Sequence, residues 1–312
     1  MLLLIKYTLL YGIVLMLVAL GGMFSEHSGI INIALEGIMV IGGVAGVLTL
    51  TMLPASMPAF ATVLIAVLVA AIAGMIYSLL LAFASINLKA DQTIGGTALN
   101  LLATAVAVVI SKNFSDSGSA KLNYSNKPFL FSIGGLELSI FVPLGIVLLV
   151  ISYVVLYKTR FGLRLRACGE NPQAADSLGI NVYKMRYAGT TISGALAGMG
   201  GFVYALTTAN CASNGDVAGF GFLALAVMIF GNWKPVNIAV SSLLFGLFKC
   251  IAASYASIDI NGDGVYMLAE IGISAHLYRM LPYIVTLLVL AFTSKSSRAP
   301  KAEGIPYDKG SR

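Results

Sequence analysis

The sequence has few charged residues. Only 10% of its 312 residues are Asp, Glu, Lys or Arg, whereas an ordinary soluble domain carries roughly 25%. Hydrophobic residues make up 58% of the chain, and its mean hydropathy is +0.91. A water-soluble globular protein is excluded, because so few charges cannot cover its surface. The composition instead predicts a surface that faces lipid, so membrane lipid is an expected partner.

Histidine and cysteine are also scarce. The chain has two histidines and three cysteines, and no two cysteines form a C-x-x-C pair, so neither a metal site nor a disulfide framework is indicated. The sequence also lacks the P-loop motif G-x-x-x-x-G-K-[ST], the zinc motif H-E-x-x-H and the nucleophile motif G-x-S-x-G. We therefore expect no catalytic residues, no metal and no cofactor bound by this chain, and no ATP hydrolysis by the chain itself.

Long apolar runs recur along the whole sequence. A bilayer crossing by a helix needs about 20 apolar residues, whereas a membrane barrel shows alternating segments of about ten. The candidate spans are Leu2–Gly22, Ile30–Leu50, Phe60–Ala84, Thr93–Ser111, Leu138–Leu156, Tyr187–Thr207, Ala218–Phe230, Val236–Ser254 and Leu281–Phe292. The seventh and ninth are short, so they are tilted, extended by flanking residues or re-entrant. The predicted fold class is all-α, a polytopic transmembrane helical bundle of about 8–9 spans.

Positive charge is concentrated in two places. The segment Tyr157–Arg186 carries six Lys or Arg, and residues 295–312 form a basic tail after the transmembrane domain of residues 1–294. Lys and Arg beside membrane spans are retained in the cytoplasm, so both segments are placed inside. Nine crossings then put the N-terminus outside and the C-terminus in the cytoplasm. Membrane topology explains the net charge of +6, and nucleic acid is not an expected partner.

Three motifs carry a family resemblance. They are SEHSGIINIALEGIMVIGG at 25–43, TRFGLRLRACGENPQAADSLGINVYKMRYAGTTISGALAGMGG at 159–201, and GFGFLALAVMIFGNWKP at 219–235. Together and in this order they resemble permease subunits of ABC importers for branched-chain amino acids, simple sugars and nucleosides. They are most similar to the nucleoside permeases that work with a substrate-binding lipoprotein of the BMP type.

The resemblance implies function and partners. It implies a multi-pass permease of the bacterial plasma membrane that forms a translocation path with a second homologous permease. ATP-Mg would be bound by a separate ABC ATPase subunit, and an extracytoplasmic lipoprotein would deliver the substrate. Nucleosides are the expected substrates, and simple sugars or branched-chain amino acids are the alternative.

The resemblance also places a cytoplasmic coupling helix, which inserts into a groove on the ATPase, in the loop 157–186. The matching residues are Asn171, Pro172, Ala174, Ala175 and Gly179. Local chemistry agrees, because Asn caps a helix, Pro suits its first turn and Gly ends it. Small alanines would allow close approach of a partner surface. The alternative is a short interfacial helix without a partner.

Three polar residues inside apolar spans are candidates for the substrate path. Asn32 and Glu36 lie one helical turn apart, between Gly29 and Gly37, which could bracket a broken helix. An ionisable group inside a membrane usually faces a cavity or a partner, although Glu36 could instead form a structural salt bridge or cap. Asn100 could read a nucleobase edge or ribose hydroxyls, or could form an interhelical hydrogen bond.

A secondary transporter driven by an ion gradient is the rival function. Such a transporter needs acidic or histidine residues deep in several spans to bind the coupling ion. Glu36 is the only acidic residue that meets this condition in the predicted spans. The pattern therefore favours an ATP-driven permease.

Overall fold

The computed structural model describes residues 2–54, 56–115, 118–124, 130–133, 136–209, 211–255, 274–293 and 298–310. Its helices are α1 (Leu2–Glu26), α2 (Leu35–Met52), α3 (Ala59–Ile86), α4 (Gln92–Phe114), α5 (Phe141–Lys158), α6 (Arg160–Glu170), α7 (Pro172–Ser177), α8 (Val182–Thr207), α9 (Phe220–Phe230), α10 (Pro235–Ser254) and α12 (Ala275–Thr293). Four short strands, β1 (Leu122–Asn123), β2 (Leu130–Ile133), β3 (Leu136–Ser139) and β4 (Ala212–Ser213), form the antiparallel pairs β1–β4 and β2–β3.

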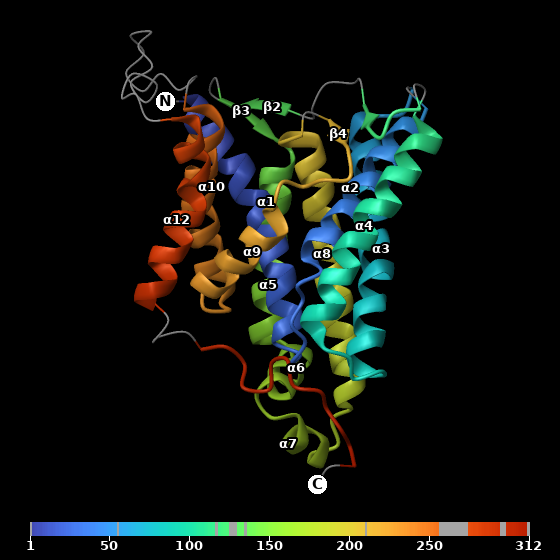
Figure 1. The fold of residues 1–312 in the computed structure, drawn as a ribbon, viewed down its shortest axis with the longest axis vertical. Helices are drawn as coiled ribbons and strands as arrows, with labels where there is room; N and C mark the ends of the chain where they lie inside the picture. Colours follow the sequence, from blue (N-terminus) through green and yellow to red (C-terminus); the bar gives the residue numbers. More distant parts are fainter. Residues whose placement is uncertain are drawn as a thin grey trace.

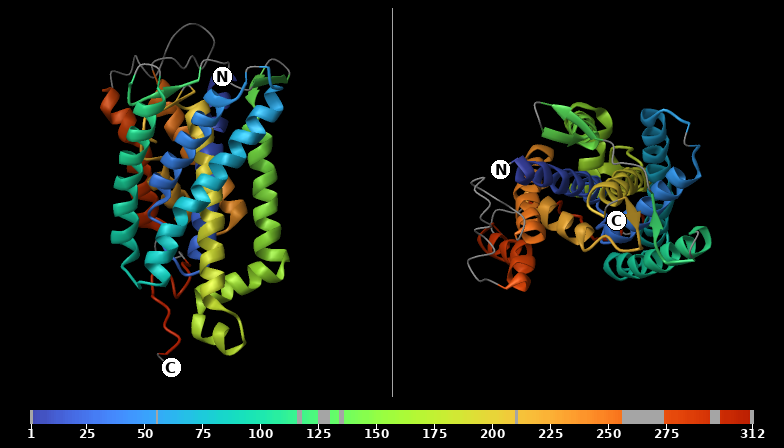
Figure 2. Two further views of the ribbon diagram at one scale, coloured as in Figure 1. Left: turned by 90° about the vertical axis from the view of Figure 1, so that its right-hand side faces the viewer. Right: turned by 90° about the horizontal axis from the view of Figure 1, so that it is seen from above.

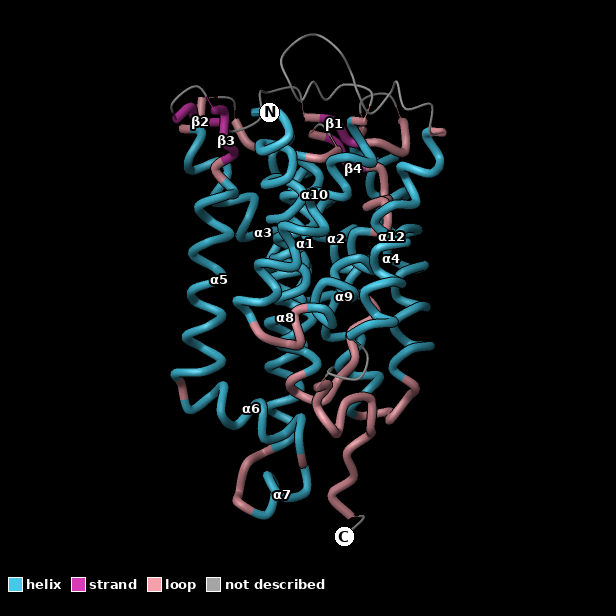
Figure 3. Tube along the Cα trace, turned by 90° about the vertical axis from the view of Figure 1, so that its left-hand side faces the viewer, coloured by secondary structure: helices cyan, strands magenta, loops and turns pink. Residues whose placement is uncertain are grey.

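The helices form one bundle whose long members run side by side (Figure 1). The chain begins at the end that carries the strands, and α6, α7 and the C-terminus lie at the opposite end (Figures 1 and 3). Each of the nine predicted spans falls on a helix. Among the described residues, six helices are long and apolar enough to cross a membrane: α1, α2, α3, α4, α5 and α10. The predicted all-α transmembrane bundle is confirmed.

Helix α8 runs through the interior of the bundle, where it packs against α1, α2 and α3. It is less apolar than the lipid-facing helices because protein covers most of its surface. Its glycines allow the close packing that the sequence predicts. A Cβ added to Gly198 would lie 3.0 Å from the Cα of Gly74 on α3, and one added to Gly43 on α2 would lie 3.1 Å from the carbonyl oxygen of Gly201. Helices associate in lipid through such contacts.

Two transmembrane stretches are interrupted by non-helical chain. Residues 27–34 separate α1 from α2, and residues 211–219 lead from the strand end of the bundle to α9 (Figure 1). Helix α9 has 11 residues and is about 16 Å long at 1.5 Å per residue, which is too short for a hydrocarbon core of about 30 Å. How the short seventh span crosses the membrane therefore stays with the three alternatives predicted from the sequence.

Candidate functional site

The break between α1 and α2 is held by side chains from α4. Non-helical backbone at membrane depth is tolerated only where protein or water satisfies its polar groups. The amide of Ile31 donates to Oε1 of Gln92 at 2.7 Å, and Nδ2 of Asn100 donates to the carbonyl oxygen of Ile33 at 3.0 Å. Gly29, in the turn after α1, has a φ of +94°, which favours glycine. As predicted, the chain is non-helical after Gly29, where residues 27–34 separate α1 from α2.

Asn100 forms a second bond that closes the break. Its Oδ1 accepts from the amide of Gly37, in the first turn of α2, at 2.8 Å. The interhelical hydrogen bond, one of the two roles proposed for Asn100 from the sequence, is thus present. Gly37 does not bracket the break, because it lies inside α2, where a Cβ would come within 3.0 Å of the Cα of Asn100.

Replacing Asn100 by leucine is expected to destabilise the protein. The substitution leaves the Ile33 carbonyl and the Gly37 amide without their partners, at a cost of about 1–3 kcal/mol for each buried group. The melting temperature in detergent should fall, while transport per folded molecule changes less. Thr97→Val is the matched control for the melting temperature alone, because Thr97 is exposed and its hydroxyl bonds back to the Thr93 carbonyl. An unchanged melting temperature with lost transport would instead indicate contact with substrate.

Asn32 lies inside the break and is fully buried. Its Nδ2 donates to Oγ of Ser193 on α8 at 2.8 Å. Its Oδ1 is buried and has no hydrogen-bond partner among the described residues. Asn32 therefore joins the break to α8 by one hydrogen bond, and its side-chain oxygen can still accept another. Its predicted role in the substrate path stays a prediction.

Glu36 binds the beginning of α9. Its Oε1 accepts from the amide of Gly219 at 2.8 Å, and its Oε2 accepts from the amides of Gly221 at 2.6 Å and Phe222 at 3.3 Å. A helix begins with amides that have no intrahelical partner and with partial positive charge. The Glu36 carboxylate on α2 thus accepts hydrogen bonds from the free amides at the start of α9, beginning 183 residues further along the chain. We name these three hydrogen bonds the clasp. Through them Glu36 caps a helix, one of the roles proposed for it from the sequence, inside the bundle.

The clasp leaves little room around it. A Cβ on Gly221 would lie 2.5 Å from the Cα of Glu36, so only glycine allows α2 to approach the first turn of α9. Gly219 and Ala218 have φ values of +73° and +51°, and Oδ1 of Asp216 accepts from the Ala218 amide at 2.8 Å. The left-handed turn before α9 is therefore fixed by local hydrogen bonds and by the Glu36 carboxylate.

Lys249 on α10 and a group of aromatic rings surround the same turn. Nζ of Lys249 lies 4.6 Å from the centre of the Phe220 ring and donates to the Ala218 carbonyl at 3.3 Å. The Tyr283 ring of α12 is 5.8 Å from the same Nζ. Phe220 also contacts the ring of Tyr204, with centres 5.0 Å apart. The start of α9 therefore combines one cation, one carboxylate and several aromatic faces.

Helix α4 contributes a polar stripe on one side of this turn. Thr93, Thr97 and Thr104 are exposed on α4, where they follow the spacing of Asn100 along one helix face. A Cβ on Gly215 would lie 3.5 Å from the Thr104 carbonyl oxygen, so the chain that leads to α9 passes beside this stripe. α4 and α12 stand at the outside of the bundle, with the chain leading to α9 between them (Figures 1 and 2).

The second candidate region, α7, hangs below the bundle (Figure 1). Oδ1 of Asn171 accepts from the Ala174 amide at 3.0 Å, Pro172 occupies the first turn, and Gly179 has a φ of +79° after the helix. The predicted cap, start and stop are therefore confirmed. The role of these residues in coupling to an ATPase stays a prediction.

The two alanines of α7 face different ways. Ala174 is exposed, as expected for close approach of a partner. Ala175 is only 2% exposed, and it packs in an apolar cluster inside the chain with Cys168, Val182 and Tyr307. The expectation that both alanines offer a contact surface is therefore wrong for Ala175. A six-residue helix is too short to show in its sequence which face is covered.

Two residues of these regions were not predicted from the sequence. Lys249 lies within the predicted span Val236–Ser254, and the rule for intramembrane ionisable residues that selected Glu36 applies to it equally. Leu178 follows α7 and is 82% exposed. A large apolar side chain standing in water at the tip of a polar loop is the signal that would have identified it.

Comparison with known proteins decides the family. Residues 4–290 match the family model described as the permease component of the branched-chain amino acid transport system. The chain belongs to this family of ABC transporter permeases. This permease is thus a membrane-spanning transport subunit and not an enzyme, as the sequence predicts.

Two relatives cover nearly the whole permease, and a third covers most of it. It is 42% identical to the nucleoside ABC transporter permease protein NupC of Lactococcus lactis, over 96% of this chain and 95% of that protein. It is 40% identical to the guanosine ABC transporter permease protein NupQ of Bacillus subtilis, over 98% of this chain and 96% of that protein. The NupP permease of the same organism is 29% identical, over 72% of this chain and 67% of that protein. No solved structure matches the permease.

Proposed function

We propose that this permease imports nucleosides such as guanosine across the bacterial plasma membrane. The observation that carries the proposal is identity of 40–42% over almost the full length to permeases named for nucleosides and guanosine. A relative named as a putative glucose permease is more distant, with 28% identity over 89% of this chain. Simple sugars therefore remain the second candidate.

The chemistry around the start of α9 suits a nucleoside. The exposed ring of Tyr283 can stack on a base, because base–aromatic stacking requires only a π-face on each partner. Hydroxyls on the stripe of α4 can bond to ribose, and Lys249 supplies a donor beside the rings. We therefore place the substrate path along α4, the chain before α9 and α12, with Asn32, Glu36 and Asn100 holding the interrupted backbone behind it.

Helix α4 also suggests the site of a second permease. Of the six apolar spans it is the one least covered by the rest of this chain, although it carries a stripe of hydroxyls. A polar stripe gains nothing by facing lipid. NupP and NupQ, both from B. subtilis and both named for guanosine, indicate two permeases of one kind in that organism. A homologous permease opposite α4 would enclose the path.

The energy and the substrate would come from other subunits. We propose that an ABC ATPase carrying ATP-Mg docks on α7 through Ala174, Leu178 and Gly179, which are exposed. A substrate-binding lipoprotein would deliver the nucleoside at the end that carries the strands. This arrangement places the N-terminus outside and α7 with the C-terminus in the cytoplasm.

The orientation can be tested by cysteine labelling. The three native cysteines are all buried and are first replaced by alanine. Ser177→Cys, on the exposed side of α7, should be shielded from an impermeant thiol reagent in intact cells, whereas Lys121→Cys, at the opposite end, should be labelled. After the membrane is permeabilised, both should react. Labelling of Ser177→Cys in intact cells would overturn the orientation, since the positive-inside count is its main basis.

Uptake in cells tests the substrate. In a strain deleted for this permease, labelled guanosine uptake should be lost and should return with the wild-type gene. Unlabelled adenosine or inosine should compete with guanosine, and a large excess of ribose or leucine should not. Competition by ribose equal to that by nucleosides would favour the sugar alternative. Unchanged guanosine uptake in the deletion strain, together with lost uptake of leucine, would contradict the proposal.

A further inference from the structure

The C-terminal segment, residues 298–310, does not extend freely from the bundle. It runs beneath the bundle beside α6, α7 and α8 (Figures 1 and 3), and we name it the strap. Three of its amides bond to the rest of the chain. The Arg298 amide donates to Oδ1 of Asn232 at 2.9 Å, the Ala302 amide donates to the Gly169 carbonyl at 2.8 Å, and the Gly304 amide donates to the Gly29 carbonyl at 3.2 Å.

Side chains hold the strap as well. Glu303 lies beside the buried Glu26, whose Oε2 accepts from Nε1 of Trp233 at 2.5 Å. Burial raises the pKa of the Glu303 carboxyl group. Nη2 of Arg186, a residue only 1% exposed, donates to the Ile305 carbonyl at 2.9 Å. A segment with a basic composition is thus fixed mainly by buried contacts.

The tip of the strap reaches the inner face of α7. Tyr307 is 6% exposed, and its ring meets that of Tyr183 edge-on with centres 5.3 Å apart. It completes the apolar cluster with Cys168, Ala175 and Val182. Ala175 is the one buried residue that α7 contributes. Helix α7 has only six residues, so its position depends on the contacts of Ala175 with this cluster. Tyr307 supplies a large part of that contact surface.

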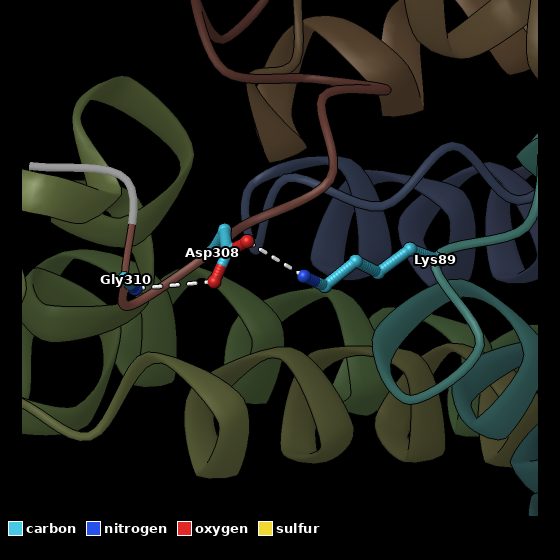
Figure 4. A network of polar contacts seen from close by, with 3 residues as sticks. All are labelled: Lys89, Asp308 and Gly310. Carbon is cyan, nitrogen blue, oxygen red and sulfur yellow. Dashed lines mark hydrogen bonds and ion pairs between the residues drawn. The ribbon is translucent and has the colours of Figure 1, made fainter.

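An exposed ion pair is the outermost contact of the strap. Nζ of Lys89, in the turn between α3 and α4, lies 2.7 Å from Oδ2 of Asp308, and Oδ1 of the same side chain accepts from the Gly310 amide (Figure 4). Both charged side chains are about half exposed, at 45% and 50%. Pairs of this kind contribute little because water screens them. Lys89 therefore provides a control for the buried contacts.

We propose that the strap transmits movement between α7 and the break that separates α1 from α2, with Tyr307 as its positioning residue. Tyr307 touches the cluster that holds Ala175, and three residues earlier Gly304 bonds to Gly29. Gly29 in turn lies three residues before Asn32, in the same break. A displacement of α7 by a docked ATPase would reach the break through this short, doubly anchored segment. The inference rests on the proposed docking of the ATPase at α7.

The test uses the full transporter, with wild type and three variants of this permease. Tyr307→Ala removes the ring from the cluster, Tyr307→Phe keeps the ring, and Lys89→Ala removes the exposed ion pair. For each complex we would measure the amount of ATPase that co-purifies, the melting temperature, and guanosine transported per ATP hydrolysed. The last ratio reports transmission, and a role limited to folding would not change it.

For Tyr307→Ala we expect unchanged ATPase binding. The ratio of guanosine transported to ATP hydrolysed should fall by roughly threefold to tenfold, because the loss of one aromatic pair corresponds to a factor of this size. Tyr307→Phe and Lys89→Ala should behave as wild type. A fourth variant, in which the chain ends after Ile305, should lower the ratio at least as much. A wild-type ratio in both Tyr307→Ala and the shortened chain would overturn the inference.

A variant of α7 itself, Leu178→Glu, separates the strap proposal from the docking proposal. If Leu178→Glu leaves ATPase binding intact, the docking proposal fails, and the proposed role of the strap loses its basis.

Discussion

Replacing Glu36 by leucine should abolish guanosine uptake and lower the melting temperature of the permease. The substitution removes the acceptor for three amides at the start of α9. Each buried amide left without a partner costs about 1–3 kcal/mol, and water cannot replace the carboxylate inside the bundle. The turn that carries Ala218 and Phe220 would lose its position, so uptake should fall more than about tenfold. Thermal unfolding in detergent and uptake per mole of protein measure the two effects.

Two further variants separate the clasp from a direct contact with substrate. Glu36→Gln keeps one carbonyl acceptor and should be intermediate in both measurements. Asp216→Asn is the matched control, because Asn can still accept from the Ala218 amide, and it should resemble wild type. If Glu36→Leu loses uptake but keeps the wild-type melting temperature, Glu36 acts on the substrate rather than on α9. An effect on neither quantity would contradict the clasp.

Leu178→Glu should abolish ATP-driven transport without affecting the fold. Leu178 is 82% exposed at the tip of the loop that holds α7, so the folded permease loses no packing. An apolar anchor buried in a partner's pocket is the kind of residue whose change costs 2 kcal/mol or more at an interface, roughly 30-fold or more in affinity. A buried unpaired carboxylate adds to this cost.

The measurement for Leu178 is co-purification of the ATPase with the permease, together with uptake. Leu88→Glu is the control, because Leu88 is an exposed leucine, at 64%, in the turn after α3. Normal protein level, lost ATPase binding and lost uptake are expected for Leu178→Glu, and normal values for Leu88→Glu. Wild-type ATPase binding by Leu178→Glu would show that the ATPase docks elsewhere.

Local features of this fold could be predicted from the sequence. Apolar runs indicate the spans because each crossing must cover a fixed hydrocarbon thickness. The cap by Asn171 and the stop at Gly179 follow from the conformations of a few adjacent residues. Gly29 marks the helix break for the same reason. These features depend on neighbours in the chain, which a sequence shows directly.

Contacts between distant segments could not be predicted. Nothing beside Glu36 in the sequence indicates that its partners are the amides of Gly219 and Gly221. The strap reads as a basic tail because its buried residues, such as Tyr307, are too few to form an apolar pattern. Ala175 faces inward because it packs in a cluster with Tyr307, which is far from it in the chain. Such pairings are set by tertiary packing, and a single sequence carries no signal for them.

The most direct test of the proposed function is transport by purified components. The permease, a second homologous permease and the ABC ATPase are reconstituted in liposomes, and the binding lipoprotein is supplied with labelled guanosine. Guanosine should accumulate only with hydrolysable ATP on the side of α7, and labelled ribose and leucine should not accumulate. Accumulation of ribose or leucine in place of guanosine, or guanosine transport that follows an ion gradient without ATP, would contradict it.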